Sequence, residues 1–444
     1  MATIFCCTRA GFAADYLVGD TDGALAPADF AWQTLRAGDR VVLRPGNYSD
    51  TILISARGTQ KDPVVVGAAP GTVLRCSVVL SGAQHVVLDG LTIEDARGGG
   101  VVLTGQSSGN RILRSTVRRC GLGILFKDGT GSANTVEDCL IEANLTNGIA
   151  VDRFNASPSG ANALVGNIVS RNGYHGIDLN GSHYRVERNR VAGNGSRIAG
   201  TSGIHVYARD RAEGTGRHNL IRANIVSGQR ETTGQDGNGI QVDTWCDDNE
   251  VTFNAAFGNC GAGIHLYDAS ANRVSNNTVV GNMVDCDSGH VLRGELVVAS
   301  DEVRRLDHAH RNLLVNNIAV ATRPRTAAMA IHRTITDAPG VFAGNILWRT
   351  GPGPLWTWAG REGVEIAPWN RLRPGSPAWD ALDRSVDPDL GQLVPTAELP
   401  ASRAFRPRRG PAFGGFAGLP SAGQTDLAGG RTVPGLTGAL MPAG

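Results

Sequence analysis

Histidine, aspartate and tyrosine recur at fixed places in several short, similar segments of this sequence. Histidine exchanges a proton near neutral pH, and carboxyl and phenol groups do so when their surroundings tune the pKa. Such side chains on one surface have the chemistry of general acid–base catalysis. The candidate catalytic residues are Asp152, Asp178, His205, Tyr207, Asp243, His265 and Tyr267.

Neighbouring side chains are of the types that bind a sugar chain. Arginine and lysine pair with carboxylates, and an exposed aromatic ring stacks on a sugar ring. The candidate substrate-binding residues are Lys127, Arg153, Tyr174, His175, Asn180, Arg209, Gln241 and Trp245. The plain alternative is a solvated sheet face with ordinary cross-strand pairs, and for Trp245 the packing of a loop.

The sequence gives little sign of a metal site. None of the eight cysteines lies in a Cys-x-x-Cys pair, which argues against zinc and favours buried free thiols. The acidic residues Asp236, Asp243, Asp247 and Asp248 suggest Ca²⁺, although their spacing matches no known calcium loop. We expect no metal and no cofactor, with Ca²⁺ as the one ion left open.

These candidates belong to a repeat that must position them. Each copy opens with glycine, then alternates apolar and outward residues, as in Gly176-Ile-Asp-Leu-Asn180. Successive copies begin at Gly100, Gly123, Gly148, Gly176, Gly203, Gly239 and Gly263. Strict alternation predicts short strands, and a near-constant spacing with occasional insertions predicts stacked coils with variable loops.

Asparagine recurs at five-residue steps between the copies, as at Asn249, Asn254 and Asn259. Asparagine tolerates left-handed backbone conformations, so it suits the corners between strands. Since stacked strands lie ~4.8 Å apart, corner asparagines are expected to hydrogen-bond along the stack as ladders.

The sequence therefore predicts an all-β fold, a single-stranded right-handed parallel β-helix (a solenoid) with an N-terminal cap and an irregular C-terminal region. Residues 1–98 are expected to form the cap and first coils, and 99–320 the regular coils with the candidate groove. Residues 321–395 form the last coils and a Trp-rich region, and 396–444 a tail rich in Pro, Gly and Ala.

The register in which successive coils stack decides which candidate residues lie next to one another. The second and fourth residues of each copy are apolar and are expected to point inward, while the third and fifth point outward. The line of third residues reads Val102, Leu125, Ala150, Asp178, His205, Gln241 and His265. The line of fifth residues reads Thr104, Lys127, Asp152, Asn180, Tyr207, Asp243 and Tyr267. The titratable candidate residues are therefore concentrated in the later coils.

Composition limits the partners. The net charge is +1, which argues against nucleic acid, and no apolar run is long enough to span a bilayer. The first twenty residues show no secretory signal. We expect an extracellular or cell-surface protein, phage-derived or exported by a non-classical route, and leave the oligomeric state open.

Several stretches resemble the pectate-lyase-like superfamily of right-handed parallel β-helix proteins, which holds polysaccharide lyases, uronan epimerases and some hydrolases. They include residues 37–48, Gly58-Thr59, 63–66, 236–243, 263–267 and 276–279, and in the tail 375–380, 387–390 and 430–439. The tandem-Asp, Gly-His-Gly and Arg-Ile-Lys signatures of polygalacturonases are missing, which argues against a pectin hydrolase.

The resemblance implies a polysaccharide partner and leaves three functions open. The leading one is a polysaccharide lyase or C5-epimerase acting on a uronate-containing chain. In that role His205 or His265 is the base, Tyr207 or Tyr267 the acid, and Lys127, Arg153 or Arg209 neutralises the sugar carboxylate. The second is an inverting glycoside hydrolase with Asp178 paired to Asp152 or Asp243. The third is a non-catalytic polysaccharide-binding protein or phage tailspike.

Overall fold

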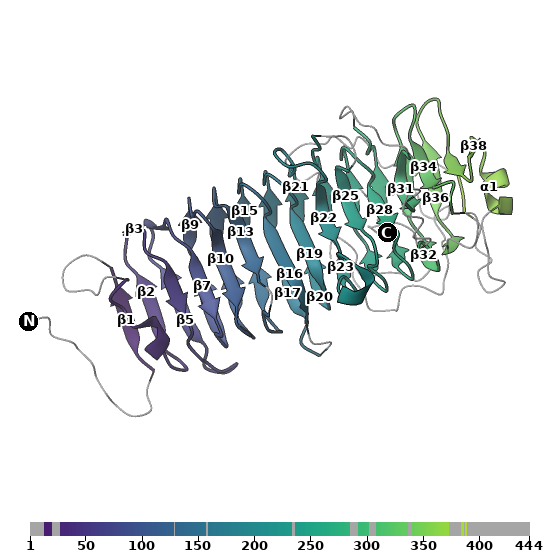
Figure 1. The fold of residues 1–444 in the computed structure, drawn as a ribbon. Helices are drawn as coiled ribbons and strands as arrows, with labels where there is room; N and C mark the ends of the chain where they lie inside the picture. The colour runs from purple at the N-terminus through teal and green to yellow at the C-terminus, as the bar shows by residue number, and fades with distance from the viewer. Residues whose placement is uncertain are drawn as a thin grey trace, which may run out of the picture.

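The computed structural model describes residues 13–19, 27–127, 129–156, 159–232, 236–284, 292–301, 308–335, 340–372, 383–385 and 387–388. The predicted tail at 396–444 and the resembling stretches 375–380 and 430–439 lie outside these residues. In the described chain, strands follow one another in coils that stack into a long solenoid (Figure 1). The predicted all-β parallel β-helix is confirmed.

The strands form three sheets that run the length of the solenoid, and each coil contributes one strand to each sheet. Every pairing within them is parallel except that of β37 with β38. Sheet 1 holds β1 (Asp15–Val18), β2 (Arg40–Leu43), β5 (Val64–Ala68), β8 (Val86–Asp89), β11 (Arg111–Leu113), β14 (Thr135–Glu137), β17 (Asn162–Val165), β20 (Tyr184–Glu187), β23 (Leu220–Arg222), β26 (Glu250–Thr252), β29 (Arg273–Ser275), β32 (Asn312–Val315) and β35 (Gly340–Ala343).

Sheets 2 and 3 complete each coil, and sheet 3 carries the glycine-initiated repeats. Sheet 2 holds β3 (Gly46–Tyr48), β6 (Thr72–Leu74), β9 (Thr92–Glu94), β12 (Thr116–Arg118), β15 (Leu140–Glu142), β18 (Ile168–Ser170), β21 (Arg190–Ala192), β24 (Ile225–Ser227), β27 (Ala255–Phe257), β30 (Thr278–Val280), β33 (Ile318–Ala321) and β36 (Ile346–Arg349). Sheet 3 holds β4 (Ile52–Ile54), β7 (Val78–Ser81), β10 (Gly99–Thr104), β13 (Leu122–Phe126), β16 (Ile149–Asn155), β19 (Ile177–Ser182), β22 (Ser202–Val206), β25 (Asn238–Val242), β28 (Ile264–Tyr267), β31 (Gly294–Ala299), β34 (Ala327–Ile331), β37 (Trp356–Trp358) and β38 (Arg361–Gly363).

Helical structure is sparse in the described chain. It comprises two short 3-10 turns, η1 (Trp32–Thr34) and η2 (Arg211–Glu213), and one helix, α1 (Ile366–Leu372). None of these helices is long and apolar enough to cross a membrane.

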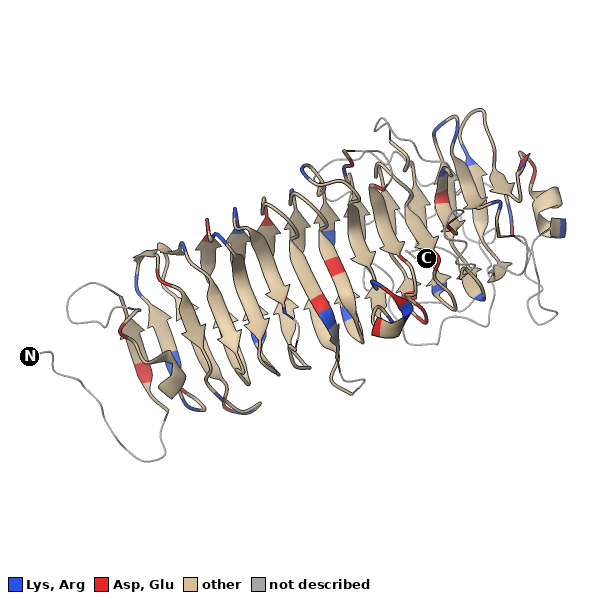
Figure 2. Cartoon of the chain, viewed as in Figure 1, with Lys and Arg blue, Asp and Glu red and all other residues tan. Residues whose placement is uncertain are grey.

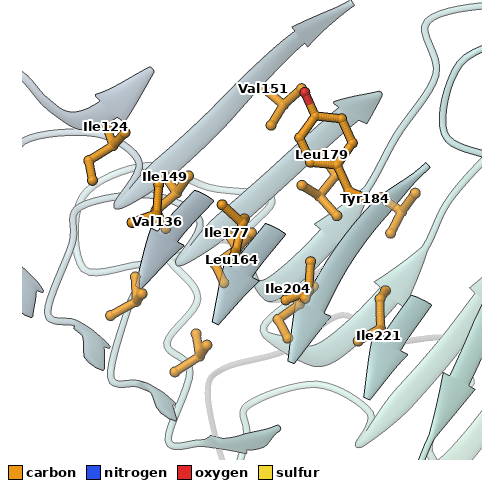
Figure 3. Packing of buried hydrophobic residues seen from close by; sticks show 14 of the residues in the cluster. Ile124, Val136, Ile149, Val151, Leu164, Ile177, Leu179, Tyr184, Ile204 and Ile221 are labelled. Carbon is orange, nitrogen blue, oxygen red and sulfur yellow. The ribbon is translucent and has the colours of Figure 1, made fainter. Parts of the chain in front are cut away.

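The core is a stack of aliphatic side chains inside the coils. The inward residues of successive repeats, such as Ile149, Ile177 and Ile204, are fully buried above one another (Figure 3). Leu179, two residues after Ile177, is buried as well, so the predicted alternation is confirmed. Burial of a Leu or Ile side chain stabilises by about 1.5–3 kcal/mol, and this stack fixes which residues face outward.

The glycine that opens each repeat is required by close packing at the corner before sheet 3. A Cβ on Gly176 would lie 2.4 Å from Cγ1 of Val191, and one on Gly203 would lie 2.5 Å from Cγ1 of Val226. Real Cβ atoms do not approach so closely, so only glycine fits. The residue immediately before this glycine therefore sits at a fixed place beside the sheet 3 surface.

The corner asparagines form the predicted ladders. Along the corner between sheets 1 and 2, Asn224 Nδ2 donates to Asn254 Oδ1 at 3.0 Å, and Asn254 Nδ2 donates to Asn277 Oδ1 at 3.0 Å. Each of these side chains also accepts from the backbone N–H of its neighbour. Buried amides without such partners would destabilise the coils, so the ladders satisfy the corners while the sheets satisfy the strands.

The backbone reason given for these asparagines is wrong in detail. The left-handed conformation belongs to the residue before the ladder asparagine, as at Arg188 before Asn189 and Phe253 before Asn254. The asparagine is needed for its amide. The thiol prediction holds for Cys76, Cys120, Cys139 and Cys246, which are buried and free, whereas Cys260 is disulfide-bonded.

Candidate functional site

Strand pairing in sheet 3 aligns the third residues of the repeats in one line. Ala150 pairs with Asp178, Asp178 with His205, His205 with Gln241, and Gln241 with His265. This is the register expected from the sequence. Strands β7, β10 and β13 of the same sheet carry no charged residue and are tan in Figure 2, whereas charged residues begin at β16.

His205 is the centre of the site. Its Nδ1 lies 2.9 Å from Oδ1 of Asp178 on the preceding coil, and its Nε2 lies 3.3 Å from Oδ2 of Asp243 on the following coil. The His205 side chain is only 11% exposed, while the two carboxylates are 25% and 18% exposed. A largely buried imidazole therefore lies between two acids that solvent still reaches.

The two acids keep this imidazole charged. Burial opposes the charged form, but the hydrogen bonds with Asp178 and Asp243 raise the pKa of His205 to about 10. Burial likewise opposes ionisation of both acids, yet the hydrogen bonds and charge of His205 hold the pKa of Asp178 and of Asp243 below the usual range. At neutral pH the centre is a carboxylate–imidazolium–carboxylate triplet with one net negative charge.

A second histidine beside the centre is neutral. The ring of His175 stacks on that of His205 with centroids 4.3 Å apart and planes 11° apart. Burial and the charge of His205 lower the pKa of His175 to about 3. The backbone N–H of Ser202 donates to His175 Nδ1 at 3.0 Å, so the ring proton lies on Nε2. The ring of Tyr174 also packs against His175, with centroids 3.9 Å apart and planes tilted by 45°.

A hydrogen-bonded chain links the centre to a third acid, Asp236. Gln241 Nε2 donates to Asp243 Oδ2 at 3.3 Å, and Gln241 Oε1 accepts from Asn238 Nδ2 at 2.9 Å. Asn238 Nδ2 also donates to Asp236 Oδ1 at 3.1 Å. Burial raises the pKa of Asp236 to about 6, with the negative charges of Asp243 and Glu231 adding to the effect against His205. Asp236 therefore holds a proton more readily than the other two acids.

Three residues of the site were missed by the sequence candidates. Asn147 Nδ2 donates to Asp178 Oδ2 at 3.3 Å, and the hydroxyl of Ser202 donates to Gln241 Oε1 at 2.6 Å. The third is Asn238. All three stand directly before the repeat glycine, as does His175. That position was a usable signal, because the glycine fixes where its predecessor lies.

Two of the candidates in the outer line flank the centre. The ring of Tyr207 stacks beside that of His205 with centroids 5.6 Å apart. Asn180 instead accepts a hydrogen bond from the hydroxyl of Thr215 at 2.7 Å, which ties it to the loop after β22.

The candidates His265 and Tyr267 lie apart from this centre. Gln241 stands between His205 and His265 in the line, so the two imidazoles are on alternate coils. Tyr267 donates to Asp301 Oδ2 at 3.1 Å, and its ring meets that of His265 edge-on at 5.7 Å. Register is as expected, but this pair belongs to a neighbouring part of the same face.

The basic candidates form a rim at the exit of the strands. Arg153 and Arg209 are exposed and share one partner, with Arg153 Nη1 3.8 Å and Arg209 Nε 3.9 Å from Oε1 of Glu213. Asp152, next to Arg153, is exposed where the pairing of β16 with β19 shifts register after Val151. Lys127 is exposed just past the end of β13. Among the described residues, none of these three cations pairs with an acid of the His205 centre.

Trp245 occupies a turn after β25 and has a left-handed backbone conformation. Its ring packs against His308 with centroids 4.6 Å apart, and the guanidinium of Arg211 lies 5.8 Å from its centroid. His308 Nε2 in turn lies 2.9 Å from Asp247 Oδ1. Trp245 thus packs against a loop and remains partly exposed at the rim.

The acidic residues considered for Ca²⁺ separate into different environments. Asp247 pairs with His308 and Arg217, and Asp248 is exposed. Among the described residues, the one group of three whose ligand atoms lie within 4.8 Å of one another is His175, Asp178 and His205. In that group both nitrogens of His205 already face carboxylates. The expectation of no metal, with Ca²⁺ as the one ion left open, stays an untested prediction.

Comparisons with known proteins agree with the fold. The family model described as "right handed beta helix region" matches residues 76–256 and 159–298, which together span half of the chain. Among solved structures, the A-module of mannuronan C-5 epimerase AlgE6 from Azotobacter vinelandii is 16% identical, with a TM-score of 0.49, over 74% of this chain and 91% of that one.

Two further solved structures are similar to a comparable degree. Pectate lyase Pel9A is 18% identical with a TM-score of 0.43, covering 77% of this chain and 81% of that one. The Dettilon tailspike protein is 18% identical with a TM-score of 0.48, covering 72% and 62%. No curated protein matches the sequence significantly. At such identities the likeness says nothing of the reaction.

Proposed function

The chain belongs to the right-handed β-helix family, and from that premise we propose that it is an enzyme that hydrolyses a polysaccharide on the outer face of sheet 3. The observation that carries the proposal is the arrangement of three acids around one buried imidazole. Asp178 and Asp243 flank His205, and Asp236 joins them through Asn238 and Gln241.

The charges of these acids suit hydrolysis. Glycoside hydrolysis needs one carboxyl group that keeps its proton and one that stays ionised, and environments that separate their pKa values identify the two roles. Asp236, with its pKa raised to about 6, is the proton donor to the leaving oxygen. Asp243, whose pKa is lowered, is the base that activates water. His205 holds Asp178 and Asp243 apart and ionised.

The same charges make hydrolysis the first candidate and the lyase or C5-epimerase reaction the second. This is the reverse of the order expected from the sequence. A lyase or C5-epimerase must first neutralise a sugar carboxylate, whereas the centre itself is negative. The oxocarbenium-like transition state of glycoside hydrolysis is positively charged, and the net negative charge of the centre stabilises it. With both nitrogens bonded to acids, His205 acts as a fixed cation in this proposal and not as the base.

A lyase or C5-epimerase acting on a uronate-containing polysaccharide is the second candidate. It is favoured by the rim of Arg153 on β16 and Arg209 in the loop after β22, which both lie near Glu213. In that reaction the rim binds the sugar carboxylate, and Tyr207 beside His205 exchanges the proton. A polysaccharide is the partner in either case. Because such a polymer does not enter cells, we propose an extracellular or cell-surface site of action.

The test is a product analysis on a panel of uronans, pectins and capsular polysaccharides. Hydrolysis generates new reducing ends without ultraviolet absorbance, whereas a lyase generates an unsaturated uronate that absorbs. An epimerase changes only the proton spectrum of the sugar. We expect reducing ends alone, and a loss of roughly 10²–10⁴-fold in Asp236→Asn. Asp248→Asn, an exposed acid outside the centre, is the matched control.

Each other result changes the assignment. Absorbance that rises with the reducing ends replaces hydrolysis by the lyase reaction, and a changed spectrum without cleavage replaces it by epimerisation. Binding without any product on the whole panel leaves the non-catalytic, tailspike-type function. Full activity in Asp236→Asn removes that residue from the role of proton donor.

A further inference from the structure

A concave surface lies on sheet 2, whereas the His205 centre lies on sheet 3. It is a groove of about 630 Å³ that crosses strands β15, β18, β21 and β24. Neither the sequence candidates nor the proposed reaction uses any residue that lines it. Its shape and charge have a simple origin in the sequence of these coils.

Small residues hollow out the floor of the groove. The outward residues Ser170, Ala192 and Ser227 pair in register on successive strands, so they form one line. Glu142 precedes this line, and Phe257 follows it on β27. Because a serine or alanine stands where larger side chains stand on either side, the surface is recessed over three coils. Successive strands are ~4.8 Å apart, so the recess is ~10 Å long between its outer coils.

Arginines border this floor on both sides. Arg171 and Arg230 follow β18 and β24, and Arg190 stands in the line beside the floor. Arg171 pairs with Glu142. The side chains of Arg190 and Arg230 have no partner among the residues that the structure describes. The lining therefore carries three guanidinium groups against one carboxylate, and two of the three are available for an anion.

We propose that this groove is a second binding site, for a carboxylate-bearing polysaccharide segment. Guanidinium groups bind carboxylates through paired, charge-assisted hydrogen bonds, and the serine hydroxyls suit sugar hydroxyls. The two available arginines, Arg190 and Arg230, come from neighbouring coils and lie along a recess that spans three coils, so the groove fits an extended chain with carboxylates better than a single small anion. Ile168, which is 45% exposed, gives an apolar contact for the face of a sugar ring.

Nucleic acid fits this surface less well. Proteins that bind single strands stack bases on aromatic side chains, and no aromatic residue lines the groove. The chain as a whole has a net charge of only +1, so it lacks the broad positive surface that holds a phosphate backbone. The observations thus favour an acidic glycan.

The groove adjoins the candidate site through shared loops. The chain that follows β21 lines the groove at Gly193 and Ser196 and then reaches Thr201 and Ser202 at the site. The chain that follows β24 lines it at Gly228 and Arg230 before reaching Asp236. Glu231 Oε2 accepts from the N–H groups of Gly200 and Thr201 and joins the two loops. A polymer bound in the groove is therefore held next to the proposed catalytic face.

The experiment measures binding and not turnover, so it does not depend on the proposed reaction. Titration calorimetry of the full chain uses hexagalacturonate as the acidic probe, with neutral maltohexaose and a deoxythymidine hexamer for comparison. We expect hexagalacturonate to bind most tightly. Arg190→Gln with Arg230→Gln should weaken this binding about tenfold or more, since two charge-assisted contacts are lost.

The controls separate the groove from general charge and from the catalytic face. Arg188→Gln with Arg311→Gln removes the same charge from exposed positions outside the groove and should leave affinity within about twofold. Ala192→Tyr fills the floor without a change of charge and should also abolish groove binding. Asp243→Asn should leave the groove titration intact even if it removes activity.

Several outcomes overturn the proposal. They are equal losses in the two arginine pairs, unchanged affinity in Arg190→Gln with Arg230→Gln, and unchanged affinity in Ala192→Tyr. Binding of maltohexaose or of the deoxythymidine hexamer as tight as that of hexagalacturonate would likewise exclude a site specific for acidic glycans.

Discussion

The early and central coils of sheet 3 share a backbone and differ in their outward residues. In β10 and β13 the outward line carries Val102 and Leu125, whereas in β19 and β22 it carries Asp178 and His205. The inward residues are the same kind throughout, from Val101 and Ile124 to Ile177 and Ile204, all fully buried.

This difference lies in the outward residues alone. Inward side chains and corner amides are of the same kind in both regions, and they determine that a coil forms. Outward positions are therefore free to vary from coil to coil, and three acids and two histidines gather on the three consecutive coils of β19, β22 and β25. Removing the outward residues of the two regions should have very different consequences.

The largest difference is expected for removal of His205. In His205→Ala, Asp178 and Asp243 lose their shared cation while still partly buried, so we expect the free energy of unfolding to fall by about 3–5 kcal/mol at pH 7. Leu125→Ala, at the same position of an early coil, should cost about 1 kcal/mol or less. Chemical denaturation of both variants measures the contrast, and equal losses would show that the triplet contributes nothing to stability.

A second difference concerns pH. The pKa of His205 is about 10 in the folded protein and near 6.5 when unfolded, so the folded state binds its proton more tightly. Its contribution to stability is complete below pH 6.5 and is lost as the pH rises toward 10. The free energy of unfolding, measured from pH 6 to pH 10, should fall more steeply with rising pH in the wild type than in His205→Gln. If the unfolding free energies of the two proteins fell in parallel with pH, His205 would not be held as an imidazolium in the folded protein.

The smallest effect on stability is expected when a titratable side chain is introduced into an early coil. Leu125→Asp places an acid between Val102 and Ala150 on the outward line, where solvent reaches it. We expect a change in unfolding free energy within about 1 kcal/mol. A melting temperature close to that of the wild type would support the separation of core and surface, and loss of folding would contradict it.

Much of the fold was readable from the sequence because it depends on local pattern. Alternation in Gly176-Ile-Asp-Leu-Asn180 identified strand and inward face, and five-residue asparagine steps identified the corners. The glycine that opens each copy then marked the register, even where an insertion changes the spacing. For that reason Asp178 and His205 were correctly expected on one line, even though they lie 27 residues apart.

The sequence could not decide which members of the two lines would touch. Asp243 reaches His205 from the outer line, whereas His265 in the same line as His205 does not, because Gln241 intervenes. Side-chain reach and rotamer decide such contacts, and spacing does not encode them. Arg153 and Arg209 illustrate the same limit, since Glu213 on a loop turn brings them together.

The sequence by itself determined the coil, its register and the face that carries titratable side chains, because these depend on which residues are apolar and how they are spaced. Only the tertiary structure decided the protonation of those side chains. His205 is cationic, His175 neutral and Asp236 ready to hold a proton because burial and neighbouring charges set the pKa of each, and both exist only once the coils have stacked.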